Sequence, residues 1–227
     1  MNADRVNFLK KLKAYGLVQD IPNVSWDTAE FLFERVIERA PETILEIGTA
    51  NGFSTIWLAS ALEQCASNGK IVTIERSAPS FKESIENFET VGVGEMICSI
   101  YGDAKVVLED WNNSQKEIKV ISDLEEVPKG PQYLEGKGLE YIVEKGEREF
   151  PATFDLVFLD AQKIHYGTFW DLIQPLLTDK SWVIVDDVLK FAEKTESFMT
   201  EIKNQFQWNY EIFQTDSDDG VMVLKKT

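Results

Sequence analysis

Two segments of the chain place charged side chains directly after apolar runs. "FDLVFLDAQK" contains Asp160 and, three residues later, Lys163, and "SWVIVDDVLK" contains the adjacent carboxylates Asp186 and Asp187. If both runs are neighbouring strands, three carboxylates converge, and their repulsion raises their pKa values. A divalent cation such as Mg²⁺, or Ca²⁺ or Mn²⁺ in its place, takes oxygen ligands and removes that repulsion. The spacing predicts a metal site at Asp160, Asp186 and Asp187, although the aspartate pair could also begin a turn or cap a helix.

A glycine loop follows an earlier apolar run, in "TILEIGTANGFST". Gly48 and Gly52 are spaced as G-x-x-x-G, and Ala50 stands where a dinucleotide fingerprint has its second glycine. The loop is therefore a poor cradle for a pyrophosphate, but its glycines let a ligand approach the backbone closely. Glu46, just before the loop, suits a cationic ligand group such as an ammonium or a sulfonium.

Two further carboxylates follow the next two strand-like runs. "KIVTIE" ends in Glu75, where an acid can accept hydrogen bonds from both hydroxyls of a ribose. "YGDA" supplies Asp103, which could receive the amino group of an adenine. Each acid could also be the solvated end of its strand. With the glycine loop, they predict a site for a nucleoside-containing ligand.

The elements that must position these side chains alternate between strand and helix from residue 43 to about residue 205. This alternation predicts a Rossmann-like α/β fold, a doubly wound and mostly parallel sheet with helices on both faces. Right-handed crossovers place the carboxyl ends of the strands on one edge, where such sheets bind ligands. The segments "YEIFQTD" and "GVMVLKK", joined through "SDDG", predict a closing antiparallel hairpin and bring the expected number of strands to seven.

The remaining segments complete a single predicted domain over residues 1–227. Residues 1–41 are expected to form N-terminal helices, one over residues 4–15 and one capped by Ser25 or Asp27. The helix in "STIWLASALEQCASNG" is expected to end at Gly69. Residues 112–150 are too long for an ordinary connection and predict an insertion, with a hairpin or short helix of its own around "LEYIVEK".

Composition excludes several classes of protein. The formal net charge of -16 disfavours a large nucleic-acid interface, because an acidic surface repels phosphates. Cys65 and Cys98 lie far apart in apolar or helical surroundings and are expected to be reduced thiols. The sequence shows neither a signal-peptide core nor a run long enough to span a membrane, which favours a cytoplasmic protein.

Four motifs in this order resemble one known family. "LEIGTANGFST", "VTIE", "GDA" and "FDLVFLDAQK" are similar to the S-adenosylmethionine-dependent O-methyltransferases of the catechol and caffeoyl-CoA type, and "DGVMVLKK" resembles the end of that family's last hairpin. The resemblance covers roughly residues 27–110 and 151–227. It implies S-adenosylmethionine as cofactor, a small catechol-like acceptor with a hydroxyl group, and a homodimer. The implied cofactor-binding residues are Glu46, Gly48, Thr49, Gly52, Ser54, Glu75, Arg76, Asp103, Ala104 and Asp160.

The resemblance also assigns the catalytic residues. Asp160 and Asp186 match two of the family's metal ligands, and Asp187 stands where the family usually has asparagine, which adds negative charge to the site. Lys163 matches the family's general base, with Asp160 beside it. A cation near a lysine lowers the lysine's pKa, so that part of the population is neutral and can accept a proton. Lys163 could instead be a surface residue, and His165 could serve as an alternative base, a substrate contact or a partly exposed side chain.

Three other functions are compatible with parts of the pattern. A tRNA nucleoside could be the acceptor if Lys10, Lys11 and Lys13 form a local basic patch. A non-catalytic cofactor-binding module would fit if Asp187 marks a decayed site and residues 112–150 bind a partner. A nicotinamide-dependent oxidoreductase is disfavoured because the G-x-G-x-x-G fingerprint is absent.

Overall fold

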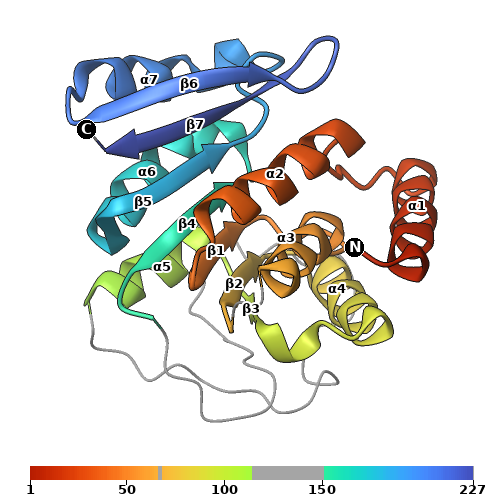
Figure 1. Ribbon diagram of the computed structural model, residues 1–227. Helices are drawn as coiled ribbons and strands as arrows, with labels where there is room; N and C mark the ends of the chain where they lie inside the picture. Colours follow the sequence, from red (N-terminus) through yellow and green to blue (C-terminus); the bar gives the residue numbers. More distant parts are fainter. Residues whose placement is uncertain (66–67, 114–150, 227) are drawn as a thin grey trace.

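A computed structural model describes residues 1–65, 68–113 and 151–226 of the chain. Its centre is a seven-stranded sheet with the strand order β3-β2-β1-β4-β5-β7-β6 (Figure 1). The strands are β1 (Thr43–Ile47), β2 (Lys70–Glu75), β3 (Ile97–Tyr101), β4 (Phe154–Leu159), β5 (Leu177–Val185), β6 (Trp208–Gln214) and β7 (Gly220–Lys226). The first five strands pair in parallel, and β7 pairs antiparallel with both β5 and β6. The predicted α/β fold with a closing antiparallel hairpin is confirmed.

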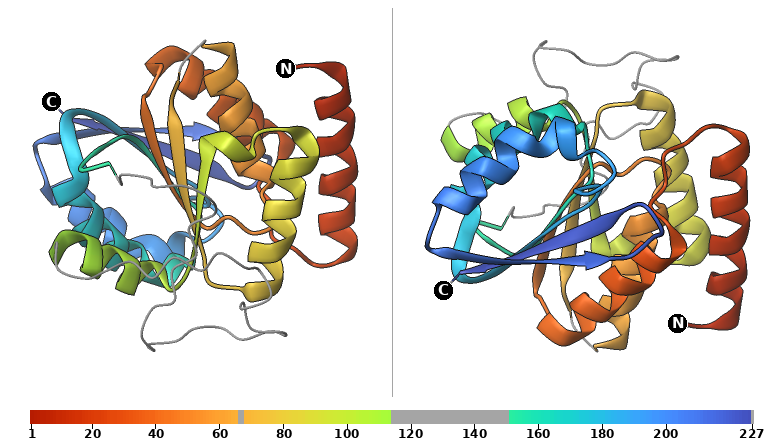
Figure 2. Two further views of the ribbon diagram at one scale, coloured as in Figure 1. Left: turned by 90° about the horizontal axis from the view of Figure 1, so that it is seen from below. Right: turned by 90° about the horizontal axis from the view of Figure 1, so that it is seen from above.

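Helices cover both faces of the sheet (Figures 1 and 2). They are α1 (Ala3–Val18), α2 (Trp26–Arg39), α3 (Phe53–Gln64), α4 (Ala78–Val91), α5 (Ala104–Asn113), α6 (Tyr166–Ile173) and α7 (Ala192–Asn204). Alternation along β1 divides the core, because successive strand side chains point to opposite faces. Ile44 packs in a cluster with side chains of α1, α2 and α3, whereas Leu45 and Ile47 pack in a cluster with side chains of α5, α6 and α7.

Local sequence signals explain where several helices begin and end. The Ser25 hydroxyl accepts a hydrogen bond from the Thr28 N–H, so Ser25, one of the two predicted residues, is the N-cap of α2. The expected end of α3 at Gly69 is wrong, because the helix ends at Gln64 and Cys65 is its C-cap. The sequence reading also missed α5, in which Ala104, Val107 and Leu108 are buried.

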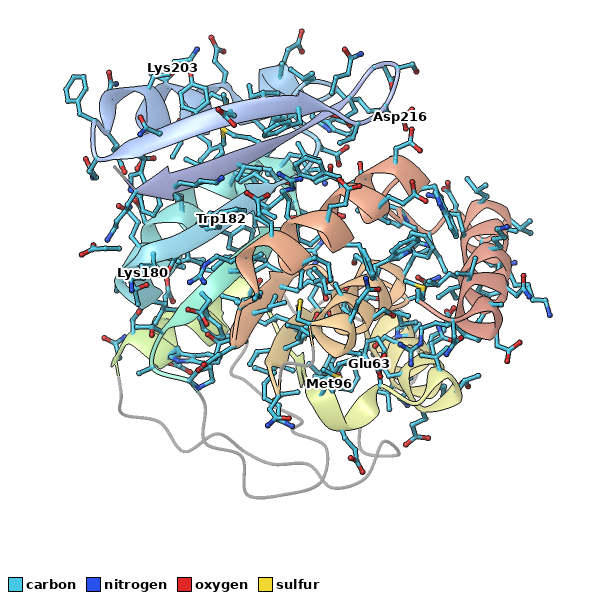
Figure 3. The ribbon with its side chains drawn as sticks, viewed as in Figure 1. Glu63, Met96, Lys180, Trp182, Lys203 and Asp216 are labelled. Atoms are coloured by element: carbon cyan, nitrogen blue, oxygen red, sulfur yellow. The ribbon has the colours of Figure 1, made fainter. Side chains whose placement is uncertain are left out.

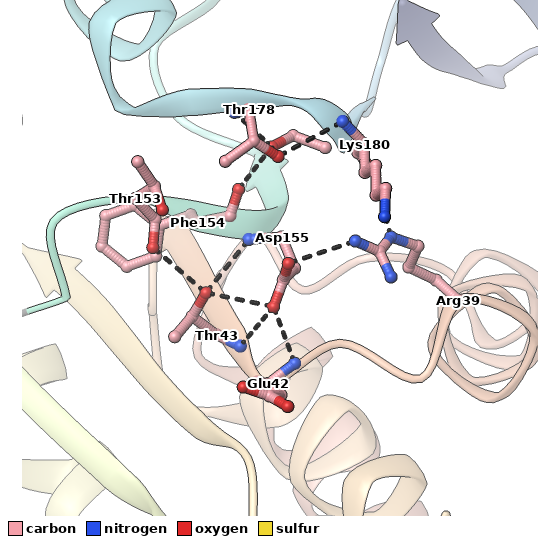
Figure 4. Close-up of polar contacts among 9 residues, drawn as sticks. Arg39, Glu42, Thr43, Thr153, Phe154, Asp155, Thr178 and Lys180 are labelled. Atoms are coloured by element: carbon pink, nitrogen blue, oxygen red, sulfur yellow. Dashed lines mark hydrogen bonds and ion pairs between the residues drawn. The ribbon is translucent and has the colours of Figure 1, made fainter.

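A polar network ties the amino ends of the central strands together, at the edge opposite the candidate site (Figure 4). One oxygen of Asp155 accepts hydrogen bonds from the N–H groups of Glu42 and Thr43 at 2.8 and 3.1 Å. Its other oxygen lies 3.1 Å from Nη2 of Arg39, whose Nε donates to the Lys180 carbonyl at 3.1 Å. The network fixes the end of α2 and the starts of β1 and β4 relative to β5.

The N-terminal helix and the closing hairpin are held by specific contacts. Arg5 of α1 forms an ion pair with Glu63 of α3, which is labelled in Figure 3, and donates to the Ser60 hydroxyl at 3.1 Å. Thr215 in the hairpin turn forms a 2.9 Å hydrogen bond with Thr28 at the start of α2. These contacts hold α1 against the end of α3 and the hairpin turn against the start of α2.

Other sequence expectations have different outcomes. Cys65 and Cys98 are free thiols, as expected. Nearly all of the expected insertion, including its hairpin or helix around "LEYIVEK", lies outside the described residues. Among the helices of the described ranges, none has the length and apolar character needed to cross a membrane.

Candidate active site

Strand register brings the motif residues to one edge of the sheet. Ile47 at the end of β1 pairs with Leu159 of β4, and Leu159 pairs with Val185 of β5. The next residues along the chain are therefore neighbours, and the Asp160 and Asp186 N–H groups continue the ladder to the Ile47 and Leu159 carbonyls at 3.0 and 3.1 Å. Parallel pairing thus joins motifs that lie far apart in the sequence.

Three carboxylates converge at this edge, as the sequence predicts. Ligand oxygens of Asp160, Asp186 and Asp187 all lie within 4.8 Å of one another. Lys163 Nζ lies between two of them, 2.7 Å from Asp160 Oδ1 and 2.5 Å from Asp187 Oδ2. The single ammonium leaves the cluster with an excess of negative charge.

Burial makes that excess costly. Asp186 is only 6% exposed, and burial together with the charges of Asp160 and Asp187 raises its pKa well above the ordinary range. Burial lowers the pKa of Lys163, but the adjacent carboxylates Asp160 and Asp187 outweigh that effect, so the pKa is raised. A lysine between these carboxylates is held as a cation, and the expected lowering of its pKa needs a second cation. This set of oxygen donors fits a hard divalent cation.

A fourth carboxylate adjoins the cluster. Asp187 has left-handed backbone geometry, with φ of 60°, which Asn and Asp tolerate better than most residues. Its side chain contacts that of Asp219, and burial, followed by this contact, raises the pKa of Asp219. Asp219 Oδ1 accepts hydrogen bonds from the N–H groups of Gly220 and Lys190 at 2.7 and 3.2 Å. Sequence reasoning missed Asp219, because "SDDG" signals only a hairpin turn and does not reveal what the turn contacts.

The two glycines of the loop lie in close contact with other parts of the protein. Gly48 has φ of +107°, and a Cβ there would lie 1.9 Å from the Asp160 carbonyl oxygen. Gly52 has φ of +86°, and a Cβ there would lie 2.4 Å from the Phe88 ring. Both positions therefore require glycine for packing, whether or not a ligand is bound.

Glu46 lies beneath this loop and is completely buried. Its Oε1 accepts a hydrogen bond from the Ser54 hydroxyl at 2.7 Å, and its Oε2 accepts from Thr55 and Thr73 at 2.5 and 2.6 Å. Thr73 is also 2.5 Å from the Thr49 hydroxyl of the loop. Burial raises the pKa of Glu46 to about 7, against the opposing effect of these hydroxyl donors.

A cavity of about 850 Å³ runs along the carboxyl edge of the sheet. Eight of the predicted site residues line it: Gly48, Glu75, Arg76, Asp103, Ala104, Asp160, Lys163 and Asp187. Five predicted site residues do not line the cavity: Glu46, Thr49, Gly52, Ser54 and Asp186. All of these except Asp186 belong to the glycine loop and the buried network beneath it. Residues lining the cavity that the sequence reading did not assign to it include Pro22, Ile47, Ala161, Gln162, Thr168 and Phe169.

The side chains along the cavity occupy defined positions. Both oxygens of Glu75 accept backbone hydrogen bonds, from Ala50 at 2.8 Å and Ser77 at 2.7 Å, and burial raises the pKa of Glu75. Asp103 accepts the Lys105 N–H at 2.9 Å at the start of α5. His165 also lines the cavity. Gln162 could have been found from its place between Asp160 and Lys163, but nothing in the sequence indicates the position of Phe169.

The basic patch that a tRNA acceptor would require on α1 does not include Lys13, which bonds within the protein. Its Nζ donates to the carbonyls of Asn23 and Val24 at 2.8 and 2.7 Å, and burial lowers its pKa. Lys10 and Lys11 are exposed on the same helix. Lys13 therefore holds the segment before α2, which includes the cavity residue Pro22, instead of presenting a charge to a nucleic acid.

Comparison with known proteins agrees with this geometry. A family profile described as a methyltransferase domain matches residues 45–188, and the chain belongs to that family. A catechol O-methyltransferase of Niastella koreensis (strain DSM 17620 / KACC 11465 / NBRC 106392 / GR20-10) is 24% identical over 160 residues, which are 70% of this chain and 55% of that protein. The chain thus spans about half the length of this curated relative.

Solved structures share the fold over nearly the whole chain. The O-methyltransferase from Bacillus cereus in complex with SAH superposes with a TM-score of 0.73 at 21% identity, covering 97% of this chain and 91% of that one. TomG from Streptomyces achromogenes, in complex with SAM, has a TM-score of 0.72 at 22% identity, with 97% and 89% covered. The SAH-bound methyltransferase PaMTH1 of Podospora anserina has a TM-score of 0.72 at 17% identity, with 100% and 89% covered. These likenesses confirm the methyltransferase fold.

Proposed function

We propose that the protein is an S-adenosylmethionine-dependent O-methyltransferase that uses a divalent cation and methylates a hydroxyl of a small, chelating, catechol-like molecule. One observation carries the proposal: a single cavity joins Glu75 and Asp103 to the carboxylates Asp160 and Asp187 and to Lys163. The part of the cavity at Glu75 and Asp103 suits a nucleoside. The part at Asp160, Lys163 and Asp187 suits a metal-bound hydroxyl. The related O-methyltransferases named above support the same assignment.

The proposed cofactor site lies along β1, β2 and β3. When bound, S-adenosylmethionine supplies a methyl group on a positively charged sulfur, which is already an activated leaving group. Glu75, oriented by the Ala50 and Ser77 N–H groups, would accept the ribose hydroxyls. Asp103 and Ala104 at the start of α5 would meet the adenine. Gly48 and Asp160, which both line the cavity, would lie beside the sulfur end.

Thr49, Gly52 and Ser54 would act on the cofactor by shaping the loop. The hydroxyls of Thr49 and Ser54 belong to the buried network around Glu46. Each of these two residues is at most 6% exposed. Gly52 leaves space for Phe88. These residues preorganise the loop that the cofactor meets, which limits the ordering cost of binding.

Asp160, Asp186 and Asp187 would hold the divalent cation. A bound divalent cation lowers the pKa of a coordinated hydroxyl and neutralises the carboxylates. Lys163 would then no longer be the counter-ion of Asp160 and Asp187, so it could release its own proton to solvent, and the neutral Nζ could accept the proton of the acceptor hydroxyl. Positioning and electrostatics are the main contributions that the chain itself must make.

The test is calorimetric titration of the protein with S-adenosylmethionine, with and without Mg²⁺, followed by mass spectrometry of products from catechol-like acceptors. We expect cofactor binding, Mg²⁺ binding that is weakened by Asp160→Asn, and a product heavier by one methylene group. Asp179→Asn is the matched control, because the Asp179 side chain is 94% exposed and pairs only with Lys226 among the described residues. No cofactor binding, or stronger binding of a nicotinamide dinucleotide, would exclude the proposal.

A further inference from the structure

We propose that Glu46 is the buried counter-charge for the cationic cofactor and that it loses a proton when the cofactor binds. This inference rests on the proposed function, because it requires a cationic ligand such as S-adenosylmethionine beside Gly48. It assigns Glu46 a role in binding that does not depend on direct contact with the ligand.

The first support is the absence of a cationic partner within the described part of the chain. Glu46 is 0% exposed, and its side-chain hydrogen bonds in that part come only from the hydroxyls of Ser54, Thr55 and Thr73. Buried carboxylates are normally paired with a cation or neutralised by a proton, because an unpaired buried charge is costly. Neutral hydroxyls reduce that cost, but they carry no compensating charge.

The second support is the position of Glu46 relative to the cavity. Gly48, two residues further along the chain, lines the cavity, and so does Asp160 at the end of the neighbouring strand β4. Asp160 acts electrostatically on Glu46, so a charge at this end of the cavity is within effective range. A positive charge there acts in the opposite direction to Asp160 and favours the ionised carboxylate.

The third support is the number of donors around the carboxylate. With Glu46 ionised, Ser54, Thr55 and Thr73 can each donate their single hydroxyl proton to it. Thr73 then has only acceptor capacity left for Thr49, so Thr49 must donate to Thr73 at 2.5 Å. In that ionised state every hydroxyl donates toward the carboxylate, and the oxygen–oxygen distances of 2.5–2.7 Å accommodate this arrangement. A protonated Glu46 must turn at least one hydroxyl away.

The groups that face Glu46 from the surrounding elements, together with its burial, determine its pKa. From β2 it faces Thr73, from α3 it faces Ser54 and Thr55, and from the end of β4 it is affected by Asp160, the one charged group acting on it in the described chain. Burial is the dominant influence and raises the pKa of Glu46 to about 7. Without ligand, a fraction of the molecules therefore carries the Glu46 proton near pH 7, and this fraction rises as pH falls.

The experiment is calorimetric titration with S-adenosylmethionine at pH 7 in several buffers of different ionisation enthalpy. Saturating Mg²⁺ in every titration keeps the aspartate cluster in one state. The dependence of the observed heat on buffer enthalpy gives the number of protons released. We expect the wild-type protein to release more protons than Glu46→Gln at pH 7, and the excess to grow toward about one proton per molecule at pH 6.

Two further variants separate this effect from general damage. Thr55→Val removes one donor to the Glu46 carboxylate and favours its protonated form, so it should release more protons at pH 7 than the wild-type protein. This variant keeps the test decisive if Glu46→Gln does not fold. Glu83→Gln is the matched control, because Glu83 on α4 also has a pKa raised by burial but does not line the cavity. It should release as many protons as the wild-type protein.

The outcomes distinguish the inference from the proposed function. Cofactor binding with the same proton release in the wild-type protein and Glu46→Gln would overturn the role of Glu46 and leave the methyltransferase proposal intact. Cofactor binding with less proton release in Thr55→Val would also contradict it. No binding of S-adenosylmethionine to the wild-type protein would overturn both.

Discussion

The buried Glu46 makes a quantitative prediction about folding stability without any ligand. Its pKa is raised from an ordinary 4.5 to about 7 by burial. Between these two values the unfolded chain has released the proton while the folded protein still holds it. Folding stability must therefore fall as pH rises through this window, because the folded state binds more protons than the unfolded state.

The magnitude follows from the size of the shift. Each pKa unit corresponds to about 1.4 kcal/mol, so the contribution of Glu46 is fully present below pH 4.5, and about 3 kcal/mol of it is lost by the time pH has risen past 7. Glu46→Gln removes this titration, while its amide can still accept and donate hydrogen bonds within the hydroxyl network. The pH dependence of the variant should be flatter than that of the wild-type protein by about 3 kcal/mol.

The assay is urea unfolding followed by circular dichroism from pH 4.5 to pH 8, without Mg²⁺ or cofactor. The comparison is the difference between the two proteins at each pH, because Asp186, Asp219 and other carboxyl groups titrate in both. Equal pH slopes for wild-type protein and Glu46→Gln would refute the reasoning, since they would mean that burial does not hold a proton on Glu46. A flatter slope in the wild-type protein would refute it more strongly.

Four other predictions address the site and its scaffold. Asp187→Asn removes one charge from the proposed metal site but keeps an oxygen that can bind a cation, so it should weaken Mg²⁺ binding about tenfold in calorimetry without abolishing it, and unchanged or tighter binding would contradict an electrostatic contribution of the Asp187 carboxylate. Lys163→Ala should lower the rate constant for methyl transfer about 100-fold or more while cofactor affinity changes little, whereas a loss confined to cofactor binding would argue against a base. Gly48→Ala should reduce the free energy of unfolding by at least about 2 kcal/mol more than the control Gly92→Ala. Both glycines have positive φ, but a Cβ at Gly48 would clash with the Asp160 carbonyl, whereas a Cβ at Gly92 meets nothing within 4 Å. Asp155→Ala should destabilise the protein by about 2–3 kcal/mol in urea unfolding by leaving backbone N–H groups unpaired, and a neutral result would show that the network in Figure 4 is dispensable.

Strong local patterns made most of the fold predictable. Apolar runs such as "TILEI" and "KIVTIE" are buried strands, and Ser25 caps α2 because a side-chain oxygen can satisfy a free N–H at a helix start. The end of α3 and the whole of α5 were not predicted. Gly69 is a strong local stop signal, but α3 ends earlier at Gln64, and α5 was missed although five of its ten residues are apolar. Where local sequence signals are weak or compete, tertiary packing determines where a helix forms and ends.

The sequence by itself determined which chemical groups follow each strand: Asp160 and Lys163 after β4, and Asp186 and Asp187 after β5. This is local information, because the residues adjoin their strands in the chain. Only the tertiary structure decided what these groups contact. Strand register makes Asp160 and Asp186 neighbours, the closing hairpin brings Asp219 against Asp187, and the packing of α3 on β1 and β2 buries Glu46 among hydroxyls. Burial and neighbouring charge set pKa values, and both depend on residues distant in sequence.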